Sequence, residues 1–583
     1  MNIRQLVVKD YLESLTERDE LNRIFPLLLE SMEFEILSKP TEYLGLQEYG
    51  KDIVAVGIDE DNVKRRFYFE LKGGADRNIT TRNFYGKDGI QESITEATYT
   101  PFVSAYPKFE DLPLKVIIVH NGVIEGGLQK TFENFLVKIS NSVDNTVFER
   151  WDIARLTAMF SENLFGAYLL TDSSTTKLFN RVLVNLDTSD GISRDFVKLI
   201  DSLFEKNEWK EYRTRIPRKW QLLFESLKLI SFIIYTESKE YNNLDITKRY
   251  LTHLVLRYWY WILKNNLESD ENILKYFNQV MKFFYEVLQQ YFDRTLSIAQ
   301  AKDGLYAENG GMYEQVGYTQ RTFDYLAYFL ILVNMEKACF KDYDLLDAKT
   351  GVHNVIRYNS VSKRPLLDIH SVVIVNTLEL FIETDDIDSA IAYLKSVLAT
   401  IRYRKEKSGM LPDANNSIQN VIKYTVTGTK PVYYSDSTSP ILAILLEYIA
   451  LFDLEAEYDQ MRIFVKKYDI TLGLFIPHHS KNSVSEELIE DKENDLEEQL
   501  FSKPLRDGYQ VDTRLTKNLI NDLPFEEFKE KMEKRKDEFI YEYRTDKAGY
   551  SFLKDLAHFY FQTPYFPDKW RNIKLNGLLK SVR

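Results

Sequence analysis

Three residues in the first third of the chain, Asp52, Glu70 and Lys72, have the types and spacing that metal-assisted hydrolysis of a phosphodiester requires. Carboxylate oxygens such as those of Asp52 and Glu70 are the ligands that Mg²⁺ prefers, and the cation activates water and neutralises developing charge. The compact ammonium of Lys72 can orient the attacking water and stabilise a pentacovalent phosphate. The three residues therefore predict a metal-dependent hydrolytic site.

Two short strands joined by a turn are expected to bring these residues together. The segment DIVAVGI, the polar turn DEDN and the segment VKRRFYFELKGG form a pattern rich in branched and aromatic residues, which is typical of a β-hairpin. Because side chains alternate along a strand, Glu70 and Lys72 share one face while Phe69 and Leu71 share the other. Asp52, at the start of the partner strand, can approach them if the register allows it.

The surrounding pattern predicts the order helix, three strands, helix, strand, helix, strand. A helix over 17–32 is expected to be kinked near Pro26, and the first strand follows at 34–37. Beyond the hairpin, a helix is expected over 89–106, a buried strand over 114–122, a helix over 128–139 and a strand over 146–153.

The text GKDIVAVG followed by FYFELKGG resembles the PD-(D/E)xK nuclease superfamily, particularly its Mrr-like restriction endonuclease branch. The segment VFERWDIARLTAMF is similar to the last strand of that family running into a helix. The resemblance implies an α/β restriction-endonuclease-like domain over 1–170 with Mg²⁺ or Mn²⁺ as its cofactor. It assigns Asp52 and Glu70 as metal ligands, the Leu71 main-chain carbonyl as a further ligand and Lys72 as the catalytic lysine. Glu20 is the candidate for the acid that family members often carry in the preceding helix, as an auxiliary ligand or a structural acid.

Other interpretations of the triad stay open, because a bare E-x-K arises often by chance. The three residues could be a surface salt-bridge cluster on an ordinary hairpin, or part of a degenerate, inactive nuclease fold, against which the intact triad argues. Basic residues around the triad could contact phosphates, although simple solvation is the better explanation of each of them taken singly, and we assign none as a DNA contact. They are Lys64, Arg65, Arg66, Arg77, Arg82 and Lys87.

Composition limits the class of protein. With 583 residues, the chain is too long for one core and predicts several domains. The single Cys339 excludes an intramolecular disulfide framework and fits a reducing cytoplasm. A net charge of −13 argues against coating nucleic acid through the overall field. The N-terminus lacks the apolar core of a secretory signal, and the most apolar later stretches, 325–335 and 440–452, are shorter than the roughly 18 residues of a membrane span.

Beyond the first domain, long stretches such as RYLTHLVLRYWYWILKNNL carry apolar residues at helical spacing. We expect a helical domain over 171–482 for sensing, oligomerisation or partner docking, then a charged linker and a C-terminal helical segment over 483–583. Arg364 and His370 in RPLLDIH have a spacing loosely allowed in HEPN-type ribonucleases, but such spacing is common by chance. No GxxxxGK[ST] phosphate loop occurs, so energy coupling would need a partner.

A nuclease domain fused to a large helical region resembles prokaryotic anti-phage defence effectors that cut nucleic acid when triggered. The resemblance implies a Mg-dependent endodeoxyribonuclease, favours double-stranded DNA as the substrate, and makes a motor ATPase or further copies of the chain candidate partners. One alternative is a helical scaffold protein whose nuclease-like domain binds nucleic acid without cleaving it. Another is a sequence-specific restriction enzyme acting alone. Whether the substrate is DNA or RNA, its sequence preference, the trigger and the oligomeric state stay open.

Overall fold

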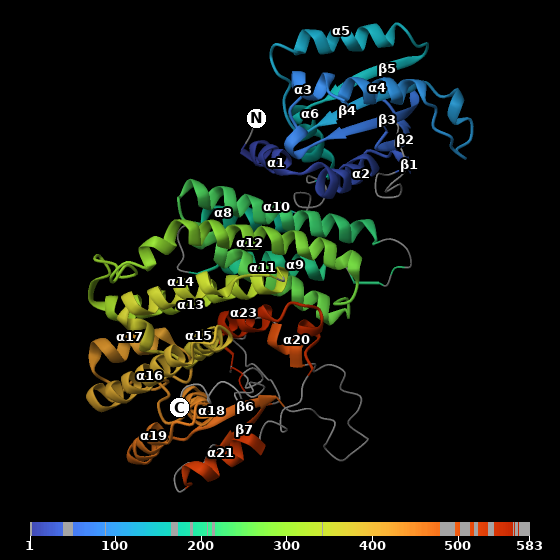
Figure 1. Ribbon diagram of the computed structural model, residues 1–583. Coiled ribbons are helices and arrows are strands. Elements are labelled where there is room, and N and C mark those ends of the chain that lie inside the picture. Colours follow the sequence, from blue (N-terminus) through green and yellow to red (C-terminus); the bar gives the residue numbers. More distant parts are fainter. Residues whose placement is uncertain are drawn as a thin grey trace, which may run out of the picture. The chain divides into compact units, whose positions relative to one another are not determined.

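The chain forms two compact units, Met1–Tyr250 and Leu251–Arg583, in a computed structural model (Figure 1). The structure describes residues 3–38, 51–87, 89–164, 173–186, 191–206, 208–210, 212, 216–340, 342–477, 496–501, 513–517, 523–534, 542–563, 565 and 570. An α/β region followed by a large helical region is the predicted fold class, and it is confirmed. Both predicted domain boundaries, after 170 and after 482, lie outside the described residues, as does most of the charged stretch that begins at 483.

A five-stranded mixed sheet organises the first unit. Its strands are β1 (Glu35–Ser38), β2 (Ile53–Ile58), β3 (Lys64–Lys72), β4 (Leu114–His120) and β5 (Thr146–Trp151), and they follow one another across the sheet in sequence order. The pairs β1–β2 and β2–β3 are antiparallel, whereas β3–β4 and β4–β5 are parallel. Strand β3 is therefore central, so both of its faces must be covered.

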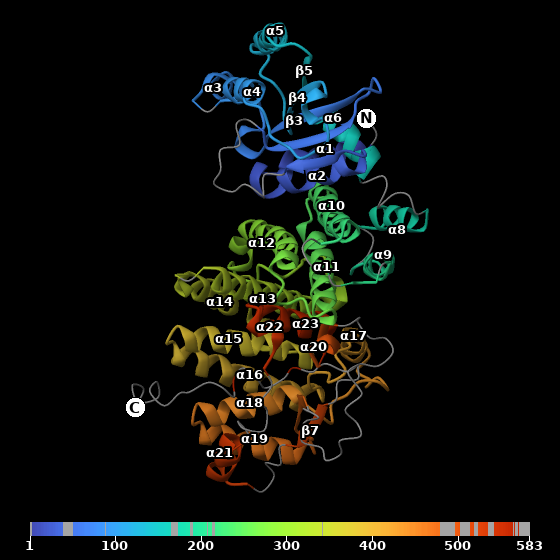
Figure 2. The ribbon, with the colours of Figure 1, turned by 90° about the vertical axis from the view of Figure 1, so that its right-hand side faces the viewer.

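Helices cover both faces of the sheet (Figures 1 and 2). One face carries α1 (Ile3–Ser14), α2 (Asn22–Ser31) and α6 (Ile153–Met159), and the other carries α3 (Thr81–Tyr85), α4 (Ile90–Tyr99) and α5 (Gln129–Ser140). On the first face, the Phe25 and Phe69 rings meet edge to face with centroids 5.4 Å apart. On the second, Ile94, Ile118 and Phe132 share a buried cluster. Burial of these apolar side chains fixes the hairpin between two helical layers.

The predicted order of elements is confirmed, with four differences. Helix α1 and the short helix α3 were not predicted. The expected helix over 17–32 is a π-helical turn at Glu17–Leu21 followed by α2, which contains Pro26. The helix expected over 89–106 stops at Tyr99, because Pro101 disfavours helical geometry at Thr100, whose backbone is extended.

The remaining helices of the first unit are α8 (Ser173–Val184), α9 (Arg194–Glu205) and α10 (Arg218–Glu240). Helix α11 (Leu244–Lys264) crosses the division between the units. The Tyr11 hydroxyl of α1 donates a hydrogen bond to Glu225 Oε2 of α10 over 3.3 Å, in a buried environment. The first unit thus extends beyond the sheet domain.

The second unit is mainly helical. Its longer helices are α12 (Glu271–Ala299), α13 (Glu314–Cys339), α14 (Leu345–Tyr358), α15 (Ser371–Glu383), α16 (Ile387–Ser408), α17 (Ile418–Thr427), α18 (Pro440–Leu451), α19 (Glu455–Lys467), α21 (Phe525–Lys534) and α23 (Phe552–Phe561). Two short helices, α20 (Leu496–Phe501) and α22 (Arg544–Lys547), accompany them. Helix α23, late in the sequence, packs against the earlier helices α13 and α15 (Figure 1).

One feature of the second unit was not predicted, the antiparallel strand pair β6 (Gly473–Pro477) and β7 (Thr513–Lys517). The Trp259 indole donates a hydrogen bond to the Thr545 hydroxyl over 2.9 Å, which ties α11 to α22.

Among the described residues, no helix combines the length and apolar character that crossing a bilayer requires.

Candidate active site

The hairpin register brings Asp52 against strand β3. Ile53 pairs with Phe69 and Val54 with Tyr68, so Asp52, one residue before β2, approaches Glu70 and Leu71. The Leu71 main-chain N–H donates a hydrogen bond to Asp52 Oδ2 over 2.6 Å. A carboxylate that accepts a backbone N–H is held in one orientation, so Asp52 is fixed against β3 between Glu70 and Lys72.

Glu70 and Lys72 form an ion pair at the end of β3. Lys72 Nζ lies 2.8 Å from Glu70 Oε1, and the two side chains are 19% and 6% exposed, respectively. The alternating residues Phe69 and Leu71 are fully buried. An ion pair this enclosed is unlike a solvated surface pair, because its charges have lost most of their water.

The electrostatics of the triad show an excess of negative charge. Burial raises the pKa of Asp52 well above its usual value, and the neighbouring Glu70 raises it further, against the Leu71 N–H and Lys72. Burial alone would lower the pKa of Lys72, but Glu70, Glu17 and Asp52 outweigh it and raise that pKa. One ammonium thus faces several carboxylates in a poorly solvated place.

Glu17, rather than Glu20, is the helix acid that reaches the triad. The Gly73 main-chain N–H donates to Glu17 Oε2 over 3.3 Å, and burial raises the pKa of Glu17 while Lys72 lowers it. Glu20 instead accepts hydrogen bonds through Oε2 from the Thr16 main-chain N–H, at 2.8 Å, and the Thr16 hydroxyl, at 2.9 Å. This geometry suits Glu20 to a structural role.

Lys51 is a second residue of the site that sequence reasoning missed. Its side chain is buried, with Nζ 5.3 Å from the centre of the Tyr68 ring. Burial lowers the pKa of Lys51 to about 8, although Glu96 of α4 and Glu70 oppose the shift. Its signal in the sequence was only its place directly before Asp52, in the text GKD.

The donor set of the hairpin fits a hard divalent cation. Asp52 and Glu70 supply carboxylate oxygens, and Leu71, whose N–H bonds Asp52, also carries the main-chain carbonyl named as a further candidate ligand. No group of three or more His, Cys, Asp or Glu side chains placed to hold a metal exists in the part of the chain that the structure describes. Mg²⁺ commonly keeps several waters and binds through one or two carboxylates, so two carboxylates with surplus negative charge are sufficient.

The basic residues around the triad have different surroundings. Arg65 pairs with Asp61, and Arg77 donates to the Glu13 carbonyl over 2.6 Å. Lys64 and Arg66 lie over the rings of Tyr106 and Phe109, respectively. Lys64 is nevertheless exposed, as are Arg82 and Lys87, on and just after α3.

The second predicted constellation, Arg364 with His370, is not an accessible pair. His370 is fully buried and stacks on Phe323 with ring centroids 4.0 Å apart, and its Nδ1 accepts the Leu366 N–H. A substrate cannot reach this imidazole without rearrangement of the core.

The chain has no match among protein-family models, curated proteins or solved structures.

Proposed function

We propose that the sheet domain of the first unit is a metal-dependent nuclease that hydrolyses phosphodiester bonds in DNA. The observation that carries the proposal is the Asp52 carboxylate, fixed by the Leu71 N–H beside the enclosed Glu70–Lys72 pair. A buried cluster in which carboxylates outnumber the ammonium lowers the free energy of unfolding. Proteins retain such unfavourable clusters mainly at functional sites.

In this proposal Asp52 and Glu70 would hold Mg²⁺ or Mn²⁺, and the cation would supply charge neutralisation at the phosphate and activation of water. Lys72 exchanges its contact with Glu70 for the attacking water and the non-bridging phosphate oxygens, and stabilises their developing charge. Glu17 keeps Lys72 charged. Lys51, with its pKa near 8, is suited to give a proton to the leaving oxygen.

The substrate class rests on local charge. The exposed Arg82 and Lys87 would contact the phosphate backbone, while a chain of net charge −13 repels DNA at longer range. We therefore propose that cleavage is controlled, and that the helical region or a partner, such as a motor ATPase or a second copy of the chain, brings the substrate to the site. Such control suits an effector of a prokaryotic anti-phage defence system.

A second candidate function is a helical scaffold whose nuclease-like domain binds nucleic acid without cleaving it. The observation that favours it is the direct Glu70–Lys72 contact, which already neutralises one of the two proposed metal ligands. Metal-dependent cleavage separates the two proposals.

The test is cleavage of plasmid DNA by the full chain with Mg²⁺ or Mn²⁺, comparing wild type with Glu70→Gln, Lys72→Met and Asp61→Asn. Asp61 is the matched control, because it is an exposed carboxylate on the same hairpin that pairs with Arg65 instead of the triad. We expect wild type and Asp61→Asn to cut, and each triad variant to lose at least about 10²-fold in rate. Cleavage that survives both triad substitutions overturns the assignment. Binding of DNA by wild type without any cleavage, even after candidate partner proteins are added, supports the scaffold.

A further inference from the structure

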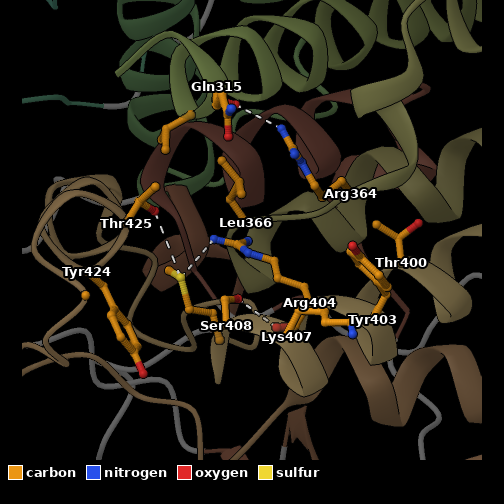
Figure 3. A pocket seen from close by; sticks show the side chains of 13 residues that line it. Gln315, Arg364, Leu366, Thr400, Tyr403, Arg404, Lys407, Ser408, Tyr424 and Thr425 are labelled. Carbon is orange, nitrogen blue, oxygen red and sulfur yellow. Dashed lines mark hydrogen bonds between the residues drawn. The ribbon is translucent and has the colours of Figure 1, made fainter. Parts of the chain in front are cut away.

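A second charged site lies within the helical unit. It is a pocket of about 390 Å³ between α13, α16, α17 and the segment that leads into α15 (Figure 3). Three basic residues contribute to its wall, Arg364 from the leading segment and Arg404 and Lys407 from α16. No Asp or Glu is among the lining residues in the described part of the chain.

The two arginines have weak or incomplete partners. Arg404 Nη1 lies 3.5 Å from the Pro365 carbonyl and Nη2 lies 3.6 Å from the Met410 sulfur, both poor acceptor contacts for a guanidinium (Figure 3). Arg364 uses one Nη for the Gln315 carbonyl and the Thr319 hydroxyl, at 3.0 and 2.9 Å. Its Nε is buried without a hydrogen-bond partner among the described residues. The two guanidinium groups can therefore donate further hydrogen bonds at this wall of the pocket.

Three acids close in sequence to lining residues or to their elements are engaged elsewhere. Asp436 pairs with Lys405, over 2.9 Å, and with Lys430. Asp413 accepts the main-chain N–H groups of Ser435 and Ser417. Glu314, next to a lining residue, pairs with Arg321. The positive charge of the pocket is thus not balanced by these neighbours.

Holding these cations together has an electrostatic cost. Burial, together with the positive charge of Arg364, lowers the pKa of Arg404 to about 10, against Tyr434, which raises it. Burial also lowers the pKa of Arg364. An anion in the pocket would relieve both effects, because it would replace lost water and oppose the mutual repulsion.

We propose that this pocket binds a phosphate-bearing small molecule of nucleotide size. Guanidinium groups match phosphate oxygens in a planar, two-pronged geometry, and Lys407 at the rim adds a third positive charge. The volume lies within the roughly 300–1,000 Å³ of typical ligand pockets, more than a bare phosphate fills. Tyr403 and Tyr424 offer rings for a base. The proposal is independent of the nuclease proposal, since no residue of the sheet domain lines the pocket.

The experiment is isothermal titration calorimetry of the full chain with ATP, AMP and inorganic phosphate. EDTA is present throughout, so that a nucleotide cannot bind through a metal at Asp52 and Glu70. The variants are Arg404→Met, Arg364→Met and the rim variant Lys407→Gln. Arg402→Gln is the matched control, because Arg402 lies on the same helix but donates to Gln460 over 2.6 Å outside the pocket.

We expect ATP or AMP to bind wild type and the control Arg402→Gln with equal affinity. Binding to Arg404→Met and to Arg364→Met should be at least tenfold weaker, and binding to Lys407→Gln about threefold weaker. Inorganic phosphate is expected to bind weakly and to compete with the nucleotide. Circular dichroism identifies a variant that fails to fold. If both Arg404→Met and Arg364→Met fail to fold, the affinity of Lys407→Gln, which replaces an exposed side chain, tests the proposal by itself. The proposal is overturned if folded wild type binds no probe at millimolar concentration, or if the pocket variants bind as wild type does. Equal affinity for phosphate and nucleotide overturns the nucleotide part.

Discussion

Replacing Asp52 by Asn is expected to stabilise the protein in the absence of metal. Asn has nearly the same shape, and its Oδ1 can still accept the Leu71 N–H that now bonds Asp52 over 2.6 Å. The substitution removes a charge that burial and Glu70 both disfavour, as the raised pKa of Asp52 indicates. Most substitutions at a site this enclosed destabilise, so a gain would be diagnostic of a site selected for function.

The size of the gain follows from the geometry. Two unit charges about 5.5 Å apart, the spacing of opposed residues in a sheet, repel by about 3 kcal/mol at an effective dielectric constant of about 20. Attraction of Asp52 to Lys72 offsets much of this, so the free energy of unfolding should rise by about 1 kcal/mol, or about 2–4 °C in Tm. The pKa of Asp52 is raised in the folded state, so this carboxyl reduces stability as the pH rises above its ordinary value of 3.8. Below about pH 4 the difference between the two proteins should vanish.

Thermal unfolding at pH 7.5, in EDTA and in excess Mg²⁺, measures both effects. In EDTA, Asp52→Asn should unfold at the higher temperature. Mg²⁺ should stabilise wild type by about 2.7 kcal/mol at 100 times its Kd and stabilise the variant far less, which reverses the order. If Asp52→Asn is less stable than wild type in EDTA, the carboxylate is not under electrostatic strain and the reasoning about the triad fails.

Further predictions concern other residues. Glu17→Gln should slow metal-dependent cleavage about tenfold in the plasmid assay, since the Glu17 carboxylate helps to hold the charged Lys72, whereas Glu20→Gln, which loses only contacts with Thr16, should leave the rate unchanged. Gly57→Ala should lower the free energy of unfolding by about 1–3 kcal/mol in a urea titration, because its Cβ would lie 2.6 Å from the Phe34 ring. Burial lowers the pKa of His253 to about 3, so stability is lost as the pH falls through the unfolded value of 6.5. His253→Phe should therefore reduce the loss of stability between pH 7.5 and 5.0 by about 2 kcal/mol in the same titration.

The sheet domain could be predicted because its signals are local. Strand periodicity, a polar turn and an apolar E-x-K strand determine which side chains share a face, and the antiparallel register then places Asp52. The helix acid could not be chosen in this way. Glu17 and Glu20 are three residues apart, a spacing that an α-helix places on one face, but the π-helical turn at Glu17–Leu21 directs only Glu17 to Gly73.

The arginine pocket could not be predicted, for a different reason. Arg364 and Arg404 belong to separate elements, and only the packing of α13 against α15 and of α15 against α16 brings them to one wall. RPLLDIH drew attention to Arg364, but on the basis of a spacing to His370 that the fold does not use. Long-range packing of helices leaves no periodic trace of which polar side chains meet, so a cationic pocket in such a region is found only in three dimensions.

The two sites have opposite charge imbalances, and this makes them separable by experiment. The hairpin carries surplus carboxylate, so its proposed ligand is a cation, while the helical pocket carries surplus guanidinium, so its proposed ligand is an anion. If they act independently, Arg404→Met leaves the Mg²⁺-dependent stabilisation unchanged, and Asp52→Asn leaves nucleotide affinity unchanged. If the helical region regulates the nuclease, each ligand must change the affinity for the other by the same factor, because coupling between two binding sites is reciprocal. Measuring Mg²⁺ stabilisation with and without AMP, at equal concentrations of free Mg²⁺, therefore gives the coupling free energy, and a value of zero would remove the pocket from any account of how cleavage is controlled.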